Sequence, residues 1–564
     1  MLELSRLSCL GEALRDAVLT YKTNVALIEV DRHREQARFT YSELRKEAER
    51  FASALQAHDF VAGDRLAILM SNQSKWLIGA LGALWSGATL VPLDYKLTPK
   101  EQLSLIAHAK PKVLLIEYGT LRPLLKEDVS ALEKVRVIVT EAPAKADIGS
   151  AIRWESLSGG KFTLTHRAQD DVACIVYSSG TSGDPKGCML THANYMAQAE
   201  VLGRMYPMAE DEKFFSILPT NHAIDFMLGF LMPLMFGGGI VHQRTLRPEF
   251  LLPTMHAYEV THIALVPRML KALQKKLEEQ LDEREPWART AVERLASLNE
   301  LATARKPNHF VSSKLLAPVH KKFGGRLKLI VAGGAFVERG VAEFFYRMGF
   351  PIAIGYGLTE AGTVISVNDL KPFRADTVGA PIPGTELEIR GATDEGVGEV
   401  WVRGPTVFKG YLEAPELTRD ALVDGWLKTG DLGTLDAAGH LKLLGRAKNM
   451  IVTSGGKNVY PEDIESAFAD VDGVEEYCVF AQSYLQPGKL ADDQLVIVVR
   501  LKDDADSAQV FEDLRRQNLT LSEYKRVGAL LAYAPEFPRT ASQKIKREPL
   551  ARALAAATLA LKPL

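Results

Sequence analysis

The chain has only four cysteines among its 564 residues, and this scarcity limits the classes of protein to which it can belong. Cys9, Cys174, Cys188 and Cys478 lie far apart or without pattern, so they provide neither a disulfide framework nor the spacing of a zinc site. The first residues, MLELSRLSCLGEALRDAV, contain acidic and polar breaks that a secretory signal lacks. We therefore expect a reducing, cytoplasmic location.

An excess of charge of one sign is also absent. The 68 basic and 70 acidic residues give a net charge of −2. A near-neutral chain shows no global preference for nucleic acid or for an anionic membrane. We expect no nucleic-acid partner, while a peripheral contact with a membrane stays open.

Long hydrophobic runs are scarce as well. The longest uncharged run, residues 76–93, is just long enough to span a membrane. It contains Gly79, Gly82, Gly87 and Pro92, however, and divides into a helix that ends near Gly87 and a strand, ATLVPL. We therefore expect a buried core and no transmembrane segment.

Hydrophobic residues make up 47% of the chain and charged residues 24%, which is typical of a globular protein. The length predicts at least two domains. Residues 39–116 alternate between amphipathic helical segments and short apolar strands, and the alternation returns at residues 261–273 and 327–349. This order is typical of a parallel sheet covered by helices, so we expect an α/β fold.

Two regions depart from this alternation. Residues 276–322 are highly charged, with Leu295, Leu298 and Leu301 at three-residue spacing, and they predict a helical insertion on the surface. After residue 385, short strands and turns predict a small β-rich portion, and a further α/β stretch begins near residue 450. The charged turn at residues 445–449 is the expected domain boundary.

The segment YSSGTSGDPKG (177–187) is the most informative part of the chain. It follows an apolar run, a predicted strand, and it precedes MLTHANYMAQ, a predicted helix. Glycines let backbone N–H groups converge, hydroxyls add donors and Lys186 adds charge, so this arrangement predicts a phosphate cradle. The Walker A pattern is absent. The alternative is a surface turn rich in small residues.

The same segment closely resembles the signature loop of the adenylate-forming superfamily, which includes acyl-CoA synthetases, luciferases and peptide-synthetase adenylation domains. Four further segments resemble that family and follow in its order: GYGLTE (355–360), TGD (429–431), GRAK (445–448) and PRTASQKI (538–545). The resemblance implies nucleotide binding by residues of these segments and of LKLIVAGGA (327–335). They are Ser178, Ser179, Gly180, Thr181, Ser182, Gly183, Lys186, Gly334, Ala335, Gly355, Tyr356, Gly357, Thr359, Asp431, Arg446 and Lys448.

The GYGLTE segment has a chemical interpretation of its own. Tyr356, between two glycines, offers an aromatic face to a purine, and Thr359 offers a hydrogen bond to an α-phosphate. Glu360 offers a hard oxygen ligand to Mg²⁺, and the resemblance adds Thr181 as a second metal-binding residue. The alternative for Tyr356 and Thr359 is an ordinary strand-to-helix turn.

The TGD segment predicts the ribose contact. A carboxylate at Asp431 would accept hydrogen bonds from both ribose hydroxyls, and the resemblance implies that Arg446 helps to hold ribose or phosphate. Taken alone, an Asp after a Gly more often belongs to a turn.

Lys544 has the most sharply defined role. Attack of a carboxylate on an α-phosphate builds negative charge, which a lysine ammonium would stabilise in the transition state. The alternative is a solvated basic tail. The chain has Gln543 where the family usually has Gly, which affects the expected flexibility of the loop. The resemblance completes the catalytic set with Glu360, Thr181 and His222.

His222 lies in SILPTNHAIDFMLGF, where the family places a residue that gates the acyl pocket; a structural histidine is the alternative. Peptide-synthetase domains carry an Asp directly after this position. Here Ala223 follows and Asp225 lies two residues further on, which argues against an α-amino acid substrate. The apolar residues that come next would suit either an acyl tail or a plain core.

Lys448 matches the family hinge about which a C-terminal domain swings between two half-reactions. Beyond it, TSGGKNVYP (453–461) resembles the segment that lines the pantetheine tunnel of acyl-CoA synthetases, which assigns Gly455 and Gly456 to CoA. Together with the helical insertion, this segment makes the chain most similar to long-chain fatty acyl-CoA synthetases.

We therefore expect an α/β protein with a large domain at residues 1–447, with parallel helix-covered sheets and a β-rich portion, and a small mobile α+β cap at 448–564. The resemblance implies that a carboxylic acid and ATP form acyl-AMP with Mg²⁺, and that CoA then takes the acyl group. The acid is expected to be a medium- or long-chain fatty acid. The alternatives are transfer to an acyl carrier protein and a catalytically silent regulator that binds nucleotide or acyl-CoA.

Overall fold

The computed structural model describes residues 7–178, 186–283, 285–452, 458–469, 471–485, 494–539, 545–556 and 561–564. Its contacts divide the chain into two units, residues 1–386 with 402–427 and residues 387–401 with 428–564. The predicted hinge at Lys448 lies inside the second unit, and the boundary of a mobile cap at residue 448 stays a prediction. Within the described ranges, no helix has the length and apolar character needed to cross a membrane.

The first unit contains a nine-stranded sheet, and six of its neighbouring strands run parallel. In spatial order the strands are β16 (Ala380–Pro381), β15 (Ser366–Val367), β14 (Ile352–Tyr356), β13 (Leu329–Gly333), β12 (His262–Leu265), β10 (Lys213–Ser216), β11 (Gly239–Gln243), β1 (Val25–Asp31) and β2 (Arg34–Thr40). The parallel set runs from β14 to β1, and the edge strands are antiparallel. The loops after β10, β13 and β14 therefore leave the sheet at one edge.

An eight-stranded sheet forms the other half of the first unit. In spatial order its strands are β19 (Gly410–Tyr411), β9 (Lys186–Thr191), β8 (Val172–Ser178), β4 (Thr89–Pro92), β3 (Arg65–Leu69), β5 (Val113–Glu117), β6 (Arg136–Thr140) and β7 (Ile152–Arg153). The strands from β8 to β7 pair in parallel, while β9 and β19 are antiparallel.

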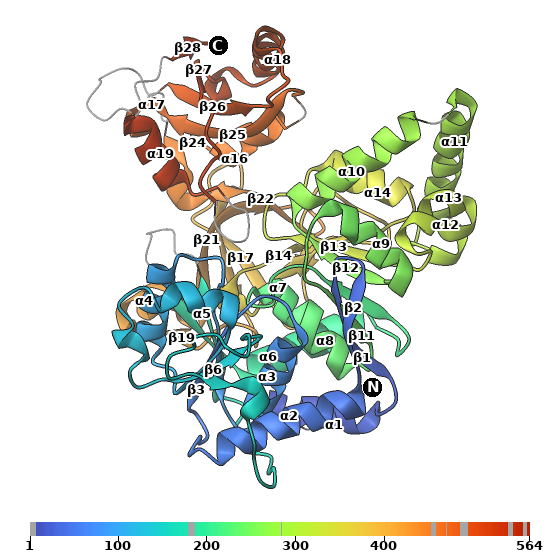
Figure 1. Cartoon of the computed structure of the whole chain (residues 1–564). Helices are drawn as coiled ribbons and strands as arrows, with labels where there is room; N and C mark the ends of the chain where they lie inside the picture. Colours follow the sequence, from blue (N-terminus) through green and yellow to red (C-terminus); the bar gives the residue numbers. More distant parts are fainter. Residues whose placement is uncertain are drawn as a thin grey trace. The chain divides into compact units, whose positions relative to one another are not determined.

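Helices cover both sheets of the first unit (Figure 1). They are α1 (Leu10–Thr20), α2 (Tyr41–Gln56), α3 (Ser74–Trp85), α4 (Pro99–Ala109), α5 (Tyr118–Leu124), α6 (His192–Met205), α7 (Ala223–Asp225), α8 (Met232–Met235), α9 (Pro248–Tyr258), α10 (Pro267–Asp282), α11 (Pro286–Thr303), α12 (His309–Leu315), α13 (Ala317–His320), α14 (Arg339–Arg347) and α15 (Pro415–Ala421). Both α2 and α4 begin at a capping box, in which a threonine and a glutamate three residues later satisfy each other's backbone N–H groups. The predicted α/β fold with parallel, helix-covered sheets is confirmed.

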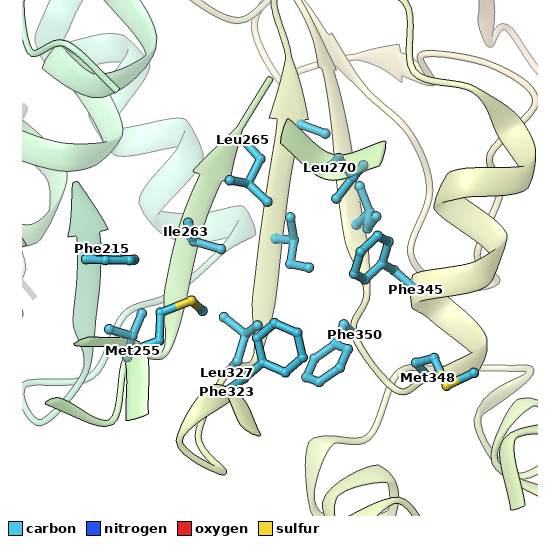
Figure 2. Close-up of a cluster of buried hydrophobic side chains, with 14 of the residues drawn as sticks. Phe215, Met255, Ile263, Leu265, Leu270, Phe323, Leu327, Phe345, Met348 and Phe350 are labelled. Carbon is cyan, nitrogen blue, oxygen red and sulfur yellow. The ribbon is translucent and has the colours of Figure 1, made fainter. Parts of the chain in front are cut away.

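A hydrophobic core lies between the nine-stranded sheet and its helices. Phe215 and Ile263 contribute from β10 and β12, and Phe345 from α14. Figure 2 shows Phe323 and Phe350 together in this core, with ring centroids 4.8 Å apart. The burial of large apolar side chains on one face holds the helices against the sheet.

The second unit is smaller and has its own core. Its elements are β17 (Glu386–Arg390), β18 (Gly398–Arg403), β21 (Trp426–Leu435), β22 (Leu441–Arg446), β23 (Ile451–Val452), β24 (Asn458–Val459), α16 (Pro461–Ala467), β25 (Val474–Ala481), α17 (Gln482–Leu485), β26 (Leu495–Leu501), α18 (Ser507–Leu519), β27 (Ala529–Ala532), α19 (Arg547–Ala556) and β28 (Lys562–Pro563). The short strand β20 (Leu422–Val423) belongs to the first unit, as do the first two residues of β21, with which it pairs. Ile497 and Val499 of β26 belong to one apolar cluster, whereas Val496 and Val498 belong to another. This alternation shows that β26 is buried on both faces of its sheet.

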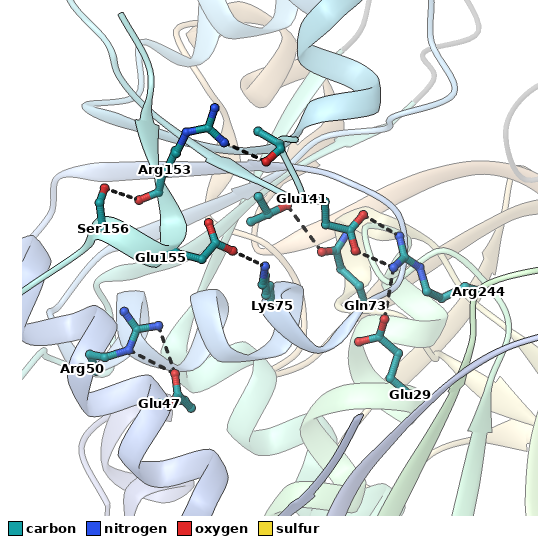
Figure 3. A network of polar contacts seen from close by, with 12 residues as sticks. Glu29, Glu47, Arg50, Gln73, Lys75, Glu141, Arg153, Glu155, Ser156 and Arg244 are labelled. Atoms are coloured by element: carbon teal, nitrogen blue, oxygen red, sulfur yellow. Dashed lines mark hydrogen bonds and ion pairs between the residues drawn. The ribbon is translucent and has the colours of Figure 1, made fainter. Parts of the chain in front are cut away.

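An ionic network joins the two sheets of the first unit. Arg244, which follows β11, contacts the carboxylates of Glu29 at 3.2 Å and Glu141 at 2.5 Å (Figure 3). Glu29 also accepts a hydrogen bond of 2.7 Å from the backbone N–H of Ser74, at the start of α3. Because Glu29 and Arg244 belong to one sheet and Glu141 follows β6 of the other, the network links the sheets.

We predict that Arg244→Met lowers the free energy of unfolding by about 3 kcal/mol, because it leaves the buried Glu29 carboxylate without its cation. Arg419→Met is the matched control, since Arg419 pairs with Glu416 on the exposed surface and should contribute less than about 1 kcal/mol. Urea denaturation of both variants provides the comparison. Equal losses of stability would contradict the linking role of Arg244.

Candidate active site

The Gly/Ser/Thr segment lies between two strands of the eight-stranded sheet. β9 pairs antiparallel with β8, so Ser178 is opposite Lys186. Helix α6 begins only at His192, where Thr191 is the N-cap and accepts a hydrogen bond from the N–H of Asn194. The predicted order of strand, loop and helix is therefore wrong, because the residues after the loop pair with β8 and β19 before the helix begins. The predicted binding residues Ser179, Gly180, Thr181, Ser182 and Gly183 lie outside the described residues.

Glu360 is the centre of a polar group formed by residues from both sheets. It lies in the single turn Thr359–Ala361 that follows β14. The hydroxyls of Ser178 and Tyr411 donate to the same carboxylate oxygen, Oε1, at 3.3 Å and 3.1 Å. The Lys186 ammonium lies 5.5 Å from the centroid of the Tyr411 ring. The predicted residues Ser178, Lys186 and Glu360 are thus brought together.

The local sequence predicts only a short strand around Tyr411, and its one distinguishing signal is the glycine beside it in KGYLEAPELT. The backbone supports its position, because the N–H of Phe408 donates to the Glu360 carbonyl at 2.9 Å. A hard carboxylate with hydroxyl neighbours suits Mg²⁺, which prefers oxygen ligands.

Close backbone packing shapes the GYGLTE turn. A Cβ atom on Gly357 would lie 1.8 Å from the carbonyl oxygen of Thr363, so only glycine fits there. Gly355, in contrast, faces open space, and the side chain of Tyr356 is buried. The neighbouring strand β13 ends at Gly333, and Gly334, which follows it with a left-handed φ of +80°, is exposed together with Ala335.

The turn that carries His222 adjoins these loops. His222 is the N-cap residue of α7. The Thr363 hydroxyl donates to the carbonyl of Ala223 at 3.3 Å, and a Cβ atom on Gly334 would lie 3.7 Å from Ile224 Cδ1. The loops after β10, β13 and β14 therefore meet around His222, Gly334 and the GYGLTE turn.

A buried hydrogen-bond network holds the His222 turn from behind. The Asp225 carboxylate oxygen Oδ2 accepts hydrogen bonds of 2.8 Å from the hydroxyls of both Ser216 and Thr220. Asn72, in the loop after β3, accepts from the Thr220 N–H at 2.9 Å and donates to the Leu218 carbonyl at 2.7 Å. Complete burial raises the pKa of Asp225 to about 7.

The second unit brings together the two residues predicted to hold ribose. Arg446 Nε lies 2.7 Å from Asp431 Oδ1, and the two residues are opposite each other on β21 and β22. Arg446 also donates to the Thr429 carbonyl at 3.2 Å. The Gly430 N–H donates to the Glu399 carboxylate at 3.2 Å, so the turn before Asp431 is fixed.

Lys448 lies in the short turn Ala447–Asn449 directly after this pair. Burial, with the nearby Arg446 and Arg547, holds the pKa of the Lys448 ammonium below its usual value. The amide of Asn449 donates to the Glu462 carboxylate at 2.6 Å, which anchors the turn to α16. The predicted residues Lys544, Gly455 and Gly456 lie outside the described residues, so their roles stay predictions.

A family model described as AMP-binding enzyme matches residues 14–412. This range includes the Glu360 group, the His222 turn and the glycine-rich segment. The chain belongs to the AMP-binding enzyme family. This match confirms the prediction that the chain is a member of the adenylate-forming superfamily.

Three known proteins show the range of the similarity. The long-chain-fatty-acid–CoA ligase FadD15 of Mycobacterium bovis is 30% identical over 423 residues, which cover 72% of this chain and 68% of FadD15. The long-chain-fatty-acid–[acyl-carrier-protein] ligase AEE15 of Arabidopsis thaliana is 27% identical over 84% of this chain and 75% of its own. The O-succinylbenzoate–CoA synthetase of Bacillus subtilis, solved with ATP and a magnesium ion, has a TM-score of 0.74 at 23% identity and covers 95% of this chain and 98% of its own. The last comparison confirms the fold, and its ligands, ATP and magnesium, are two of the three predicted cofactors and cosubstrates.

We predict that Asp225→Asn changes the pH dependence of stability. Because the pKa is raised in the folded state, the free energy of unfolding of wild type falls as pH rises from about 4 to about 7 and is constant above that range. The fall amounts to about 1.4 kcal/mol for each unit of the pKa shift. The amide of the variant keeps an oxygen acceptor but does not titrate. Its stability relative to wild type should therefore increase between pH 5 and 7 in urea denaturation, and a constant difference across that interval would contradict the buried, protonated carboxyl.

We predict that Tyr411→Phe lowers kcat/KM about tenfold at limiting Mg²⁺, because the Glu360 carboxylate loses a hydrogen bond to its charged form. The effect should shrink as Mg²⁺ is raised. Tyr484→Phe is the control, since Tyr484 is 52% exposed in the second unit. If the Mg²⁺ dependence of kcat/KM is the same in Tyr411→Phe and in wild type, Tyr411 has no role in metal binding.

Proposed function

We propose that this protein is an AMP-forming acid–thiol ligase that joins a medium- or long-chain fatty acid to CoA. The observation that carries the proposal is the Glu360 group, where Ser178, Lys186 and Tyr411 meet the GYGLTE turn at the carboxyl edge of a parallel sheet. This edge is where α/β folds bind nucleotides. The AMP-binding enzyme family and the resemblance to FadD15 support the same assignment.

In the first step, a carboxylate oxygen attacks the α-phosphorus of ATP, and pyrophosphate leaves. Glu360 and Thr181 would hold Mg²⁺, which neutralises phosphate charge when bound. Tyr411 and Ser178 orient the Glu360 carboxylate, and Lys186 adds positive charge nearby. Lys544 would supply the ammonium that stabilises charge in the transition state. No side-chain nucleophile is required, because positioning and electrostatics carry this step.

An apolar cluster beside the His222 turn is the proposed acyl site. Its partly buried members include Ile224, Leu228, Val266 and Met269, which pack against Phe214, Leu218 and Ala264. Phe226 and Phe230, in the same segment, belong to the core instead, because their rings pack edge-on against Trp76. Side chains that are partly exposed next to the nucleotide loops are suited to contact an acyl chain.

In the second step, the CoA thiol attacks the acyl carbonyl and AMP leaves, giving a thioester. The predicted swing about Lys448 and the predicted tunnel at Gly455 and Gly456 belong to this step. A phosphopantetheine arm of a carrier protein presents the same thiol, and the likeness to AEE15 makes this the second candidate acceptor. Assays with each acceptor separate the two functions.

We predict that acids of about ten or more carbons exceed acetate and benzoate in kcat/KM by orders of magnitude, since each buried methylene contributes about 0.8 kcal/mol. Thioester formation with CoA, with a carrier protein and with neither is the measurement. Leu228→Trp should lower the rate with long acids more than the rate with acetate, whereas Leu417→Trp, at an exposed position, should change neither. A preference for acetate or benzoate would contradict the assignment of a fatty acid as the substrate, but it would not contradict the proposed formation of an acyl-adenylate.

We predict that Lys544→Ala and Asp431→Ala differ when the half-reactions are measured separately. Lys544→Ala should lose adenylate formation by about 10²-fold or more, the scale of one preorganised donor, and still convert supplied acyl-adenylate to thioester. Asp431→Ala should lose both steps, because both use bound adenosine. Equal damage to both steps in Lys544→Ala would mean that one fixed conformation performs them.

A further inference from the structure

Helix α11 has one face in the core and the opposite face in solvent. Val292 and Ala296 are buried in the cluster beneath the nine-stranded sheet. At about 100° per residue, Trp287, Leu298 and Leu301 lie on the other side of the helix. They are 74%, 53% and 75% exposed. Large apolar side chains are unusual in such numbers on a surface helix and mark a contact surface.

The neighbouring helix α12 extends this surface. The hydroxyl of Ser312 on α12 donates to the Asn299 side chain on α11 at 2.7 Å, so the two helices pack together at the edge of the unit (Figure 1). Phe310 on α12 is 71% exposed, and the Lys314 ammonium lies 6.0 Å from the centroid of its ring. We call the exposed side chains Trp287, Arg294, Leu298, Leu301, Phe310 and Lys314 the α11–α12 surface.

The charge around this surface is basic on the side of α12 and of the chain that follows α11, whereas the exposed Glu283 and Glu285 precede Trp287 at the other end. Residues 301–337 contain seven Lys or Arg and no Asp or Glu. The two acidic residues within α11 have basic partners: Glu293 pairs at 3.0 Å with Arg289, which also contacts Asp282 at 2.6 Å, and Glu300 pairs with Arg347 at 3.4 Å. Among the residues that the structure describes, Arg294 and Lys314 have no acidic partner.

We propose that the α11–α12 surface docks on an anionic lipid bilayer. Trp and Leu side chains on one helix face enter the boundary between headgroups and acyl chains, and neighbouring basic residues attract anionic headgroups. Arg294 and Lys314, which lie within the surface, disfavour a second copy of the chain paired about its centre, because like charges would then face each other. This inference goes beyond the proposed reaction and does not depend on the identity of the acid.

Flotation of the full chain with vesicles tests this proposal. Vesicles of phosphatidylcholine alone are compared with vesicles that contain equal parts of phosphatidylglycerol. Wild type should bind the anionic vesicles at least tenfold more strongly. The affinity of R294Q/K314Q should fall about 25-fold, at about fivefold for each basic residue, and that of L298S/L301S at least tenfold. L417S/R419Q, at exposed positions of α15, should bind like wild type.

Insertion is measured with brominated lipids, which quench tryptophans that reach the acyl chains. Quenching should be strong in wild type and largely lost in Trp287→Phe. Equal melting temperatures and equal turnover of a soluble acid show that the variants are folded. The proposal is overturned if wild type does not float with the anionic vesicles, or if L298S/L301S binds them as strongly as wild type. It is also overturned if the protein forms a dimer that these substitutions disrupt and binds no vesicles.

Discussion

Six neighbouring strands of the nine-stranded sheet share one direction, and the candidate active site depends on this constraint. Parallel pairing brings the loops after β10, β13 and β14 to one edge, where His222, Gly334 and Glu360 lie. The eight-stranded sheet supplies Ser178 and Lys186 to the same group. Ionic contacts of Arg244 and the hydrogen bonds of Asn72 hold the two sheets together, so the site exists only while both sheets keep their positions.

The chemistry that these residues support is electrostatic. Carboxylate attack on a phosphate needs no acyl-enzyme and no phospho-enzyme, so the side chains have to position reactants and balance negative charge. In the proposed reaction, Lys186 would balance phosphate charge directly, and the Glu360 carboxylate would do so by holding Mg²⁺. In the second unit, Arg446 contacts the Asp431 carboxylate and compensates its charge, and the contact of this pair with ribose stays a prediction.

The sequence predicted the features that depend on local pattern. The alternation over residues 39–116 correctly indicated α2, β3, α3, β4, α4 and β5 in order, because each element buries a face with its own period. Asp431 and Arg446 were assigned to the same ligand and are in contact. Features that depend on distant residues were missed: β9 pairs with β19 more than two hundred residues away, and Tyr411 reaches Glu360 across 51 residues.

The central claim is that the acid is activated as an acyl-adenylate, and the fate of its oxygen atoms tests this most directly. A fatty acid labelled with ¹⁸O in both carboxylate oxygens is incubated with the protein, ATP, Mg²⁺ and CoA, and the products are analysed by mass spectrometry. Attack on the α-phosphorus makes one carboxylate oxygen the bridge of the adenylate, and thiol attack then releases that oxygen with AMP. The account predicts one labelled oxygen in AMP and the other in the thioester. Label in inorganic phosphate, or AMP without label, would contradict it.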